Sequence, residues 1–207
     1  MSLLRTLAEQ HRRPTGLLGR LIGLQMAWAS RQANHWAISL LDLQMTDQVL
    51  EVGFGPGRAI QEVARIVSQG RVAGVDFSET MLEQARRRNA RGIAAGRVDL
   101  RLGDIACLPY GDDMFDKAFA VNLLYLLPEP LFGLRELWRV MKPGGRVVFF
   151  LVAKEAMEKL PFVRSEVFRL YSGMEVVEWM QQAGFRQARL EARDTNLGSA
   201  FCVVAEK

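Results

Sequence analysis

The nine residues Val49–Gly57 constrain the fold of this chain more than any other stretch, and they read Val-Leu-Glu-Val-Gly-Phe-Gly-Pro-Gly. Val49, Leu50 and Val52 form an apolar, β-branched run, which is typical of an interior parallel strand. Three glycines then alternate with other residues, so no side chain holds a ligand away from the backbone there. A helical pattern resumes at Arg58. The stretch therefore predicts a strand, a tight turn and a helix, with a ligand at the turn.

The spacing of these glycines discriminates between classes of nucleotide ligand. In the dinucleotide fingerprint G-x-G-x-x-G, the third glycine lets the helix and the strand pack closely. Counted from Gly53, that position is occupied by Arg58. The sequence also lacks the G-x-x-x-x-G-K-[ST] pattern of nucleoside triphosphate loops. We therefore expect neither NAD nor a nucleoside triphosphate as the ligand.

Strand and helix patterns alternate along the rest of the chain. Strands are expected at residues 71–76, 98–102, 115–121, 146–152, 187–192 and 200–205, and helices at 58–67, 79–90, 131–141 and 175–183. This alternation predicts a layered α/β fold. With 207 residues, 49% of them hydrophobic, the chain is long enough for one well-buried domain and short for two.

Asp76 ends the second predicted strand, about 20 residues beyond the glycine turn. An acidic residue in this place can accept hydrogen bonds from the hydroxyls of a bound ribose. The alternative is that Asp76 caps the next helix, but Ser78 already stands in the N-cap position ahead of Glu79. We therefore expect Asp76 to be free for a ligand.

Four motifs, taken in order, resemble those of class I S-adenosylmethionine-dependent methyltransferases. Glu51 precedes the glycine turn as the acidic residue of their first motif does. The run 108–116 matches Leu-Pro-Tyr-x-Asp-x-x-Phe-Asp, and residues 141–145, Met-Lys-Pro-Gly-Gly, are similar to the family's Leu-Lys-Pro-Gly-Gly. These two runs are very like the small-molecule methyltransferases of ubiquinone and menaquinone biosynthesis. The resemblance covers about residues 46–207.

This resemblance implies a Rossmann-like, doubly wound seven-stranded sheet over residues 47–207, mostly parallel with one antiparallel strand. It also implies S-adenosyl-L-methionine as the cofactor and S-adenosyl-L-homocysteine as its product. In the family, the residue that matches Asp104 accepts a hydrogen bond from the adenine amino group, although Asp104 could instead cap a local turn. The residues that the resemblance assigns to cofactor binding are Glu51, Gly53, Phe54, Gly55, Gly57, Asp76, Phe77, Met81, Asp104, Ile105 and Asn122.

Residues 1–46 precede the first core strand, and we expect them to form a helical cap or lid over the acceptor site. Polar residues interrupt the apolar clusters of residues 17–43, so no membrane-spanning helix is expected. Trp28 and Trp36, together with His35, are suited to closing a small-molecule site. Two other interpretations stay open: these helices cover the core sheet, or they make a peripheral membrane contact.

Methyl transfer from a sulfonium needs mainly aligned reactants and a dry pocket. Enzymes that methylate a base amine carry Asn/Asp-Pro-Pro-Tyr after the fourth strand, whereas this chain has Asn122-Leu123-Leu124-Tyr125. We therefore expect a small, apolar acceptor, with residues 154–172 as a lid or substrate loop. If a general base is required, His35 and Tyr125 are the candidate catalytic residues. The alternatives are an RNA- or protein-directed methyltransferase and an inactive cofactor-binding module.

Charge and cysteine content bound the remaining functions. A net charge of +4 permits nucleic acid or an anionic membrane as a partner but requires neither. The arginine run 86–88 has no interleaved aromatic residue and is typical of a solvated helix face, so no nucleic-acid partner is expected. Cys107 and Cys202 have no metal-ligand spacing, which predicts no metal site and suits a cytoplasmic protein. Neither the acceptor's identity nor the oligomeric state follows from the sequence.

Overall fold

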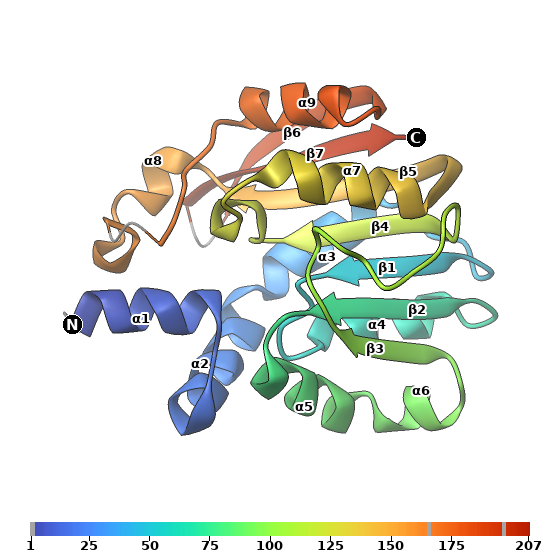
Figure 1. The fold of residues 1–207 in the computed structure, drawn as a ribbon, viewed down its shortest axis with the longest axis horizontal. Helices are drawn as coiled ribbons and strands as arrows, with labels where there is room; N and C mark the ends of the chain where they lie inside the picture. The colour runs from blue at the N-terminus through green and yellow to red at the C-terminus, as the bar shows by residue number, and fades with distance from the viewer. Residues whose placement is uncertain (1–2, 165–166, 196–197) are drawn as a thin grey trace.

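Seven strands form one sheet in the order β3-β2-β1-β4-β5-β7-β6 (Figure 1). The structure, a computed structural model, describes residues 3–164, 167–195 and 198–207. The strands are β1 (Gln48–Val52), β2 (Arg71–Asp76), β3 (Val98–Leu102), β4 (Phe115–Val121), β5 (Met141–Val152), β6 (Arg186–Thr195) and β7 (Gly198–Glu206). The pairings among β1 to β5 are parallel, and β7 runs antiparallel to both β5 and β6. The predicted doubly wound sheet with one antiparallel strand is confirmed.

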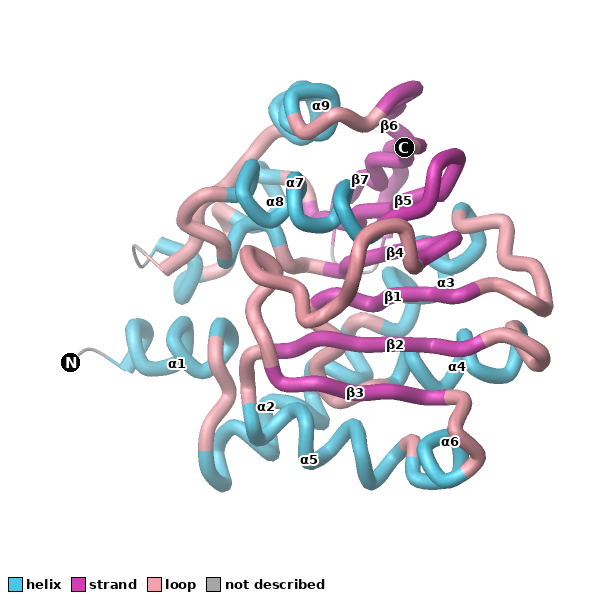
Figure 2. The backbone as a smooth tube through the Cα atoms, turned by 45° about the vertical axis from the view of Figure 1, so that its right-hand side comes forward, coloured by secondary structure: helices cyan, strands magenta, loops and turns pink. Residues whose placement is uncertain are grey.

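Helices cover both faces of this sheet (Figures 1 and 2). On one face lie α3 (Arg31–Leu40), α4 (Arg58–Ile66) and α5 (Glu79–Arg88), and on the other lie α7 (Pro130–Val140) and α9 (Gly173–Gln182). The short helix α6 (Ala90–Ala94) follows α5. At the carboxyl ends of the parallel strands lie α1 (Leu3–Arg12), α2 (Gly16–Ala29), α8 (Lys154–Met157), and the 3-10 turns η1 (Leu124–Leu126) and η2 (Pro161–Arg164).

Strand β5 begins earlier than the predicted start at residue 146. Met141 already pairs with Phe115, and regular pairing then resumes at Lys117 and Arg146 after a shift in register. The intervening Lys-Pro-Gly-Gly run contains a proline, which cannot donate a backbone hydrogen bond to a neighbouring strand. The run therefore ends α7 as expected, but it does so as an irregular first part of the strand.

Helix α3 is part of the main hydrophobic core and does not belong to a separate cap. Its residues Ala33, Trp36, Ala37 and Ile38 are buried in the core cluster. The Trp36 ring packs edge-on against Phe150 of β5, with 5.8 Å between ring centroids. The division expected at residue 46 therefore does not describe the molecule, because α3 covers the sheet and only α1 and α2 lie beyond it. Covering the sheet is one of the interpretations that the sequence left open.

Trp28 and Trp36 do not act together, contrary to expectation. Trp28, on α2, is 76% exposed, whereas Trp36 is 5% exposed. In the described part of the chain, no helix is both long enough and apolar enough to cross a bilayer.

These two tryptophans provide a direct test of where the core lies. We expect Trp36→Ala to lower the free energy of unfolding by about 3–5 kcal/mol, because it removes a buried aromatic ring and leaves a cavity. Trp28→Ala should change it by less than about 0.5 kcal/mol, since that ring is exposed. Urea denaturation of both variants measures the difference. Equal losses would mean that α3 is not packed in the core as described.

Candidate active site

Two adjoining cavities lie at the carboxyl ends of β1, β2 and β4, the edge at which open α/β sheets bind ligands. The first cavity has a volume of about 400 Å³ and the second of about 430 Å³, both within the range of small-molecule sites. Gly53, Asp76, Phe77 and Leu123 line both of them. An elongated ligand can therefore extend from one cavity into the other.

The glycine turn after β1 presents bare backbone to the first cavity. Gly53 and Gly55 have φ angles of 73° and 51°, a region that residues with side chains rarely adopt. A Cβ atom added to Gly55 would meet nothing within 4 Å, so the space beside it belongs to the cavity. Phe54, between them, is buried and also lines this cavity. The turn leaves room for a ligand to approach the main chain closely.

Gly57 has a different role from the one expected for it. It lines neither cavity and instead occupies the N-cap position of α4. A Cβ atom on Gly57 would lie 2.6 Å from the Cβ of Ala85 and 2.8 Å from Nδ2 of Asn89. The Asn89 amide also donates a hydrogen bond to the Gly57 carbonyl over 2.9 Å. Glycine is required at this position because α5 packs directly against the turn.

Asp76 ends β2 between the two cavities, but its carboxylate is not free. Its Oδ2 accepts a hydrogen bond from the Gly55 N–H at 2.8 Å, and its Oδ1 accepts one from the Ser78 N–H at 2.9 Å. Ser78 caps α5 as expected, since its Oγ accepts from the Met81 N–H at 3.3 Å. The inference that this cap leaves Asp76 without a structural role was wrong. Asp76 holds the glycine turn in place, and each oxygen keeps a second lone pair for a ligand.

Two buried acceptor atoms in the first cavity have no partner among the described residues: Oε2 of Glu51 and Oδ1 of Asn122. Leaving a buried polar atom unpaired costs about 1–3 kcal/mol, so two of them in one cavity indicate a ligand that donates hydrogen bonds. Asn122 also has a φ angle of 58°, and such unusual backbone conformations cluster at functional sites. Both acceptors fit the ammonium group in the amino-acid part of S-adenosylmethionine.

Burial controls the ionisation of Glu51. Loss of solvation raises the pKa of its carboxyl group well above the ordinary value, and the neighbouring Asp76 raises it further. The Ile60 N–H, in the first turn of α4, opposes this by stabilising the charged form. A cation bound beside Glu51 would lower the pKa again, so the site becomes electrostatically balanced when such a ligand is present.

The second cavity contains the predicted adenine-binding turn. Asp104 and Ile105 line it, together with Phe77 at its border with the first cavity. The Oδ1 of Asp104 accepts a hydrogen bond from the Ala106 N–H at 2.9 Å, so this residue also closes a local turn. Both interpretations of Asp104 are therefore compatible with the structure. Met81 lines the first cavity and is buried in contact with α2, since a Cβ on Gly23 would lie 2.6 Å from its Cε.

The two residues expected as candidate bases lie in different places. Tyr125 lines the first cavity and is buried, and burial raises the pKa of its phenol far above the ordinary value. A neutral phenol can donate a hydrogen bond but is a poor proton acceptor. The side chain of His35 is 79% exposed, its Nδ1 lies 3.4 Å from the Glu62 carboxylate, and it lines a different depression. The structure therefore does not bring His35 and Tyr125 together.

A third residue, His11 of α1, occupies the place expected for His35. It lines the first cavity, and its ring stacks on Phe162 with 4.7 Å between centroids. Its Nδ1 lies 2.8 Å from the Leu7 carbonyl oxygen. A carbonyl can only accept, so Nδ1 carries the proton and Nε2 of the neutral ring keeps its lone pair. The chain has two histidines, both before the first strand, and no local pattern shows which one faces the cavity.

Helix α1 and the segment after β5 together close the first cavity. Met157, Leu160, Phe162 and Phe168 line it from the segment predicted as a lid, and α1 packs against η2 within that segment. The Phe168 ring lies 5.8 Å from that of Tyr125. This side of the cavity is apolar, while the side next to β1 and β2 carries the carboxylates.

Asp76 leads to an expected pH dependence of ligand binding. Burial is the main cause that raises the pKa of Asp76 to about 6, and ribose hydroxyls donate more strongly to its ionised form. Below that pH the carboxyl group is protonated, so the affinity for S-adenosylhomocysteine should fall, by up to about tenfold per pH unit. Asp76→Asn should bind more weakly at neutral pH and lose this dependence, which calorimetry across the range measures. An unchanged slope in the variant would assign the proton to another group.

Similar proteins support this interpretation of the cavities. Residues 49–145 match the family model described as methyltransferase domain. The chain is 27% identical to the uncharacterized methyltransferase YdaC of Bacillus subtilis over 187 residues, which cover 90% of this chain and 98% of that protein. It is 33% identical to a demethylmenaquinone methyltransferase of Desulfitobacterium hafniense over 136 residues, which cover 65% of this chain and 52% of that protein. The chain thus spans about half the length of the quinone-directed relative.

A solved structure supports the fold separately. The S-adenosylmethionine-dependent methyltransferase from Aquifex aeolicus superposes with a TM-score of 0.75 at 24% identity, covering 90% of this chain and 97% of that one. The order of the seven strands, the bare glycine turn between two cavities and these similarities agree with one another. The chain is therefore a class I S-adenosylmethionine-dependent methyltransferase, similar to the enzymes of ubiquinone and menaquinone biosynthesis.

Proposed function

We propose that this protein transfers the methyl group of S-adenosylmethionine to a small, apolar acceptor held beneath α1 and the segment 154–172. The observation that carries the proposal is the composition of the first cavity, which is apolar on the side of Phe162 and Phe168 and polar on the side of Glu51. The polar side suits the amino-acid part of the cofactor, and the apolar side suits the acceptor. Similarity to a demethylmenaquinone methyltransferase supports an acceptor of the quinone type.

In this proposal the cofactor lies across both cavities. The Glu51 and Asn122 acceptors hold its ammonium group, Asp76 accepts from the ribose hydroxyls, and Asp104 with the Ile105 N–H contacts the adenine. Gly53, Phe54 and Gly55 form the wall between these groups, and Phe77 and Met81 complete it. When bound, S-adenosylmethionine supplies a methyl group on a sulfonium, which is electrophilic. The residues need only exclude water and hold the acceptor in line.

We further propose that His11 is the general base. An acceptor that is methylated on oxygen, nitrogen or carbon gives up a proton, and Nε2 of His11 has the lone pair to take it. The hydrogen bond from Nδ1 to Leu7 fixes the orientation of the ring, as a second partner often does for a catalytic histidine. Tyr125, kept neutral by burial, would donate a hydrogen bond to the acceptor.

The alternatives gain less support. Arg86, in the arginine run of α5, donates a hydrogen bond to the Leu100 carbonyl at 3.3 Å, which ties it to its own domain. The apolar cover over the first cavity suits neither an RNA strand nor a protein segment. An apolar acceptor of the proposed kind partitions into lipid, so a peripheral membrane contact forms part of the proposal. A cytoplasmic location stays a prediction.

The direct experiment is incubation of the protein with S-adenosylmethionine labelled in its methyl group. Separate reactions would contain reduced quinones, a total lipid extract, RNA and a protein extract. We expect label to enter quinone-type or lipid-extract compounds. Label in RNA or protein alone would overturn the proposed acceptor class, and no transfer to any fraction, with binding retained, would favour an inactive module.

Phe168→Ala tests where the acceptor binds. Removing this ring takes apolar contacts from the acceptor side, so the KM for the acceptor identified above should rise by about tenfold or more. The affinity for S-adenosylhomocysteine should stay within about twofold, because the ring is remote from the proposed cofactor groups. Steady-state kinetics and calorimetry give the two values. A matched loss of cofactor affinity would contradict the division of the cavity.

His11→Gln tests the base, with His35→Gln as its matched control. We expect kcat to fall by about 10²–10⁴ in the first variant, the usual contribution of a general base, and to remain unchanged in the second. Added imidazole should restore part of the rate of His11→Gln if proton transfer was lost, and should not if only packing on Phe162 was lost. An equal loss in His35→Gln would reject the assignment.

A further inference from the structure

The outward face of α2 is apolar, which is the reverse of an ordinary surface helix. Leu17, Leu21, Leu24 and Trp28, hereafter the outer stripe, have exposed fractions of 77%, 66%, 57% and 76%. Their spacing of four, three and four residues places them on one side of the helix. Small residues such as Gly19 and Gly23 face inward, where Gly23 packs against α5. Contiguous exposed apolar surface of this kind marks an interaction site.

The opposite side of α2 faces the first cavity. Met26, Ala27, Ala29 and Ser30 line that cavity, so α2 forms its wall. A helix is about 10–12 Å across, and the outer stripe is therefore separated from the acceptor side by the thickness of one helix. Whatever binds the stripe is placed next to the mouth of the active site.

A group of arginines adjoins the stripe at the junction of α2 and α3. Arg31 stands three residues after Trp28 and, with Arg58, Arg65 and Arg193, lines a depression of about 1000 Å³. We refer to these four side chains as the arginine basin. Within the described residues, no ion pair engages Arg31, Arg58 or Arg65.

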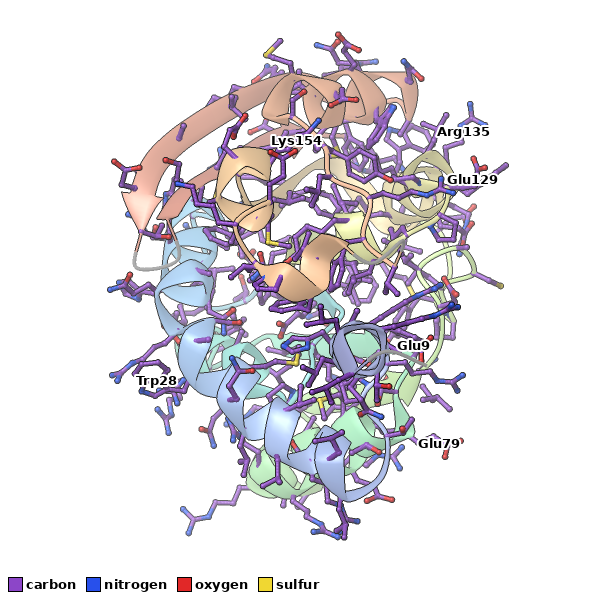
Figure 3. All side chains as sticks on the ribbon, turned by 90° about the vertical axis from the view of Figure 1, so that its left-hand side faces the viewer. Glu9, Trp28, Glu79, Glu129, Arg135 and Lys154 are labelled. Carbon is purple, nitrogen blue, oxygen red and sulfur yellow. The ribbon has the colours of Figure 1, made fainter. Side chains whose placement is uncertain are left out.

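The two carboxylates of this depression do not neutralise it. Glu62 faces the His35 ring at 3.4 Å, and Asp194 accepts a hydrogen bond from Ser199 at 2.7 Å. Four arginines against two carboxylates leave the depression positive. Residues 1–31 add to this, since they contain five arginines and one glutamate, a net charge of +4 that equals that of the whole chain. Figure 3 shows Trp28 on the opposite side of the view from Glu9 and Glu79.

We propose that the outer stripe and the arginine basin dock on the surface of a bilayer that contains anionic lipids. Leucines and a tryptophan on one helix side, flanked by arginines, are the features of a helix that lies in the membrane interface. The leucines and Trp28 would enter the acyl boundary, and the basin would face the anionic headgroups. The acceptor would then pass from the bilayer along α2 into the first cavity, a step that rests on the proposed function, whereas the docking itself does not.

The charge distribution argues against a second copy of this chain as the occupant. A symmetric dimer places the same patch of both protomers face to face. Two arginine basins would then lie close together without counter-charges. An anionic surface relieves that repulsion instead.

Co-sedimentation with lipid vesicles tests the proposal, using vesicles of phosphatidylcholine alone or mixed with phosphatidylglycerol. We expect binding to the mixed vesicles that weakens as salt is raised. Leu24→Ser should reduce it about tenfold, and the matched control Met174→Ser, which removes a side chain of 58% exposure against 57% for Leu24, should not. Arg31→Gln with Arg65→Gln should remove the preference for anionic vesicles, whereas Arg135→Gln, on α7, should not.

Each variant is also titrated with S-adenosylhomocysteine, whose binding should be unchanged. Vesicle binding without any methyl transfer would leave docking established and sink the proposed acceptor class. Methyl transfer without vesicle binding, or equal effects of Leu24→Ser and Met174→Ser, would overturn docking. Self-association that Leu24→Ser abolishes, in a protein that ignores vesicles, would identify a second copy as the occupant instead.

Discussion

The pair of hydrogen bonds accepted by Asp76 is the contact on which the site depends. One bond holds the Gly55 N–H of the turn after β1, and the other holds the Ser78 N–H at the start of α5. The Ser78 hydroxyl in turn donates to the Pro14 carbonyl at 2.6 Å, which anchors the connection between α1 and α2. One buried carboxylate thus positions the glycine turn, the helix after β2 and the N-terminal cover.

This arrangement explains why the polar groups of the cavity are tolerated. Buried carboxylates are costly to ionise, and both Glu51 and Asp76 have raised pKa values for that reason. Backbone N–H groups at the turn and at the start of α4 offset part of the cost. The remainder is left for a ligand that brings a positive charge and hydroxyl donors. The apolar segment opposite keeps water from satisfying the same groups.

Local patterns predicted the sheet and the cofactor corner because strand, glycine turn and carboxylate lie close together in sequence. The second structural role of Asp76 was not predictable, since its bond to Gly55 joins residues 21 positions apart. Gly57 was misassigned because a glycine that admits a ligand and one that admits Ala85 of a helix look alike in sequence. His35 was preferred to His11 for the same reason: only the packing of α3 on the sheet and of α1 on η2 decides which ring faces the cavity. Trp28 and Trp36 diverge likewise, because α2 and α3 have different faces buried.

A crystal structure of the complex with S-adenosylhomocysteine tests the central claim most directly. The account predicts that Oε2 of Glu51 and Oδ1 of Asn122, which lack partners here, each lie within hydrogen-bond distance of the ligand's ammonium nitrogen. It also predicts the ribose at Asp76, the adenine beside Ile105, and an apolar space left between the ligand sulfur and Phe168. A ligand bound elsewhere, or one in these cavities that leaves both acceptor atoms unpaired, would contradict the account.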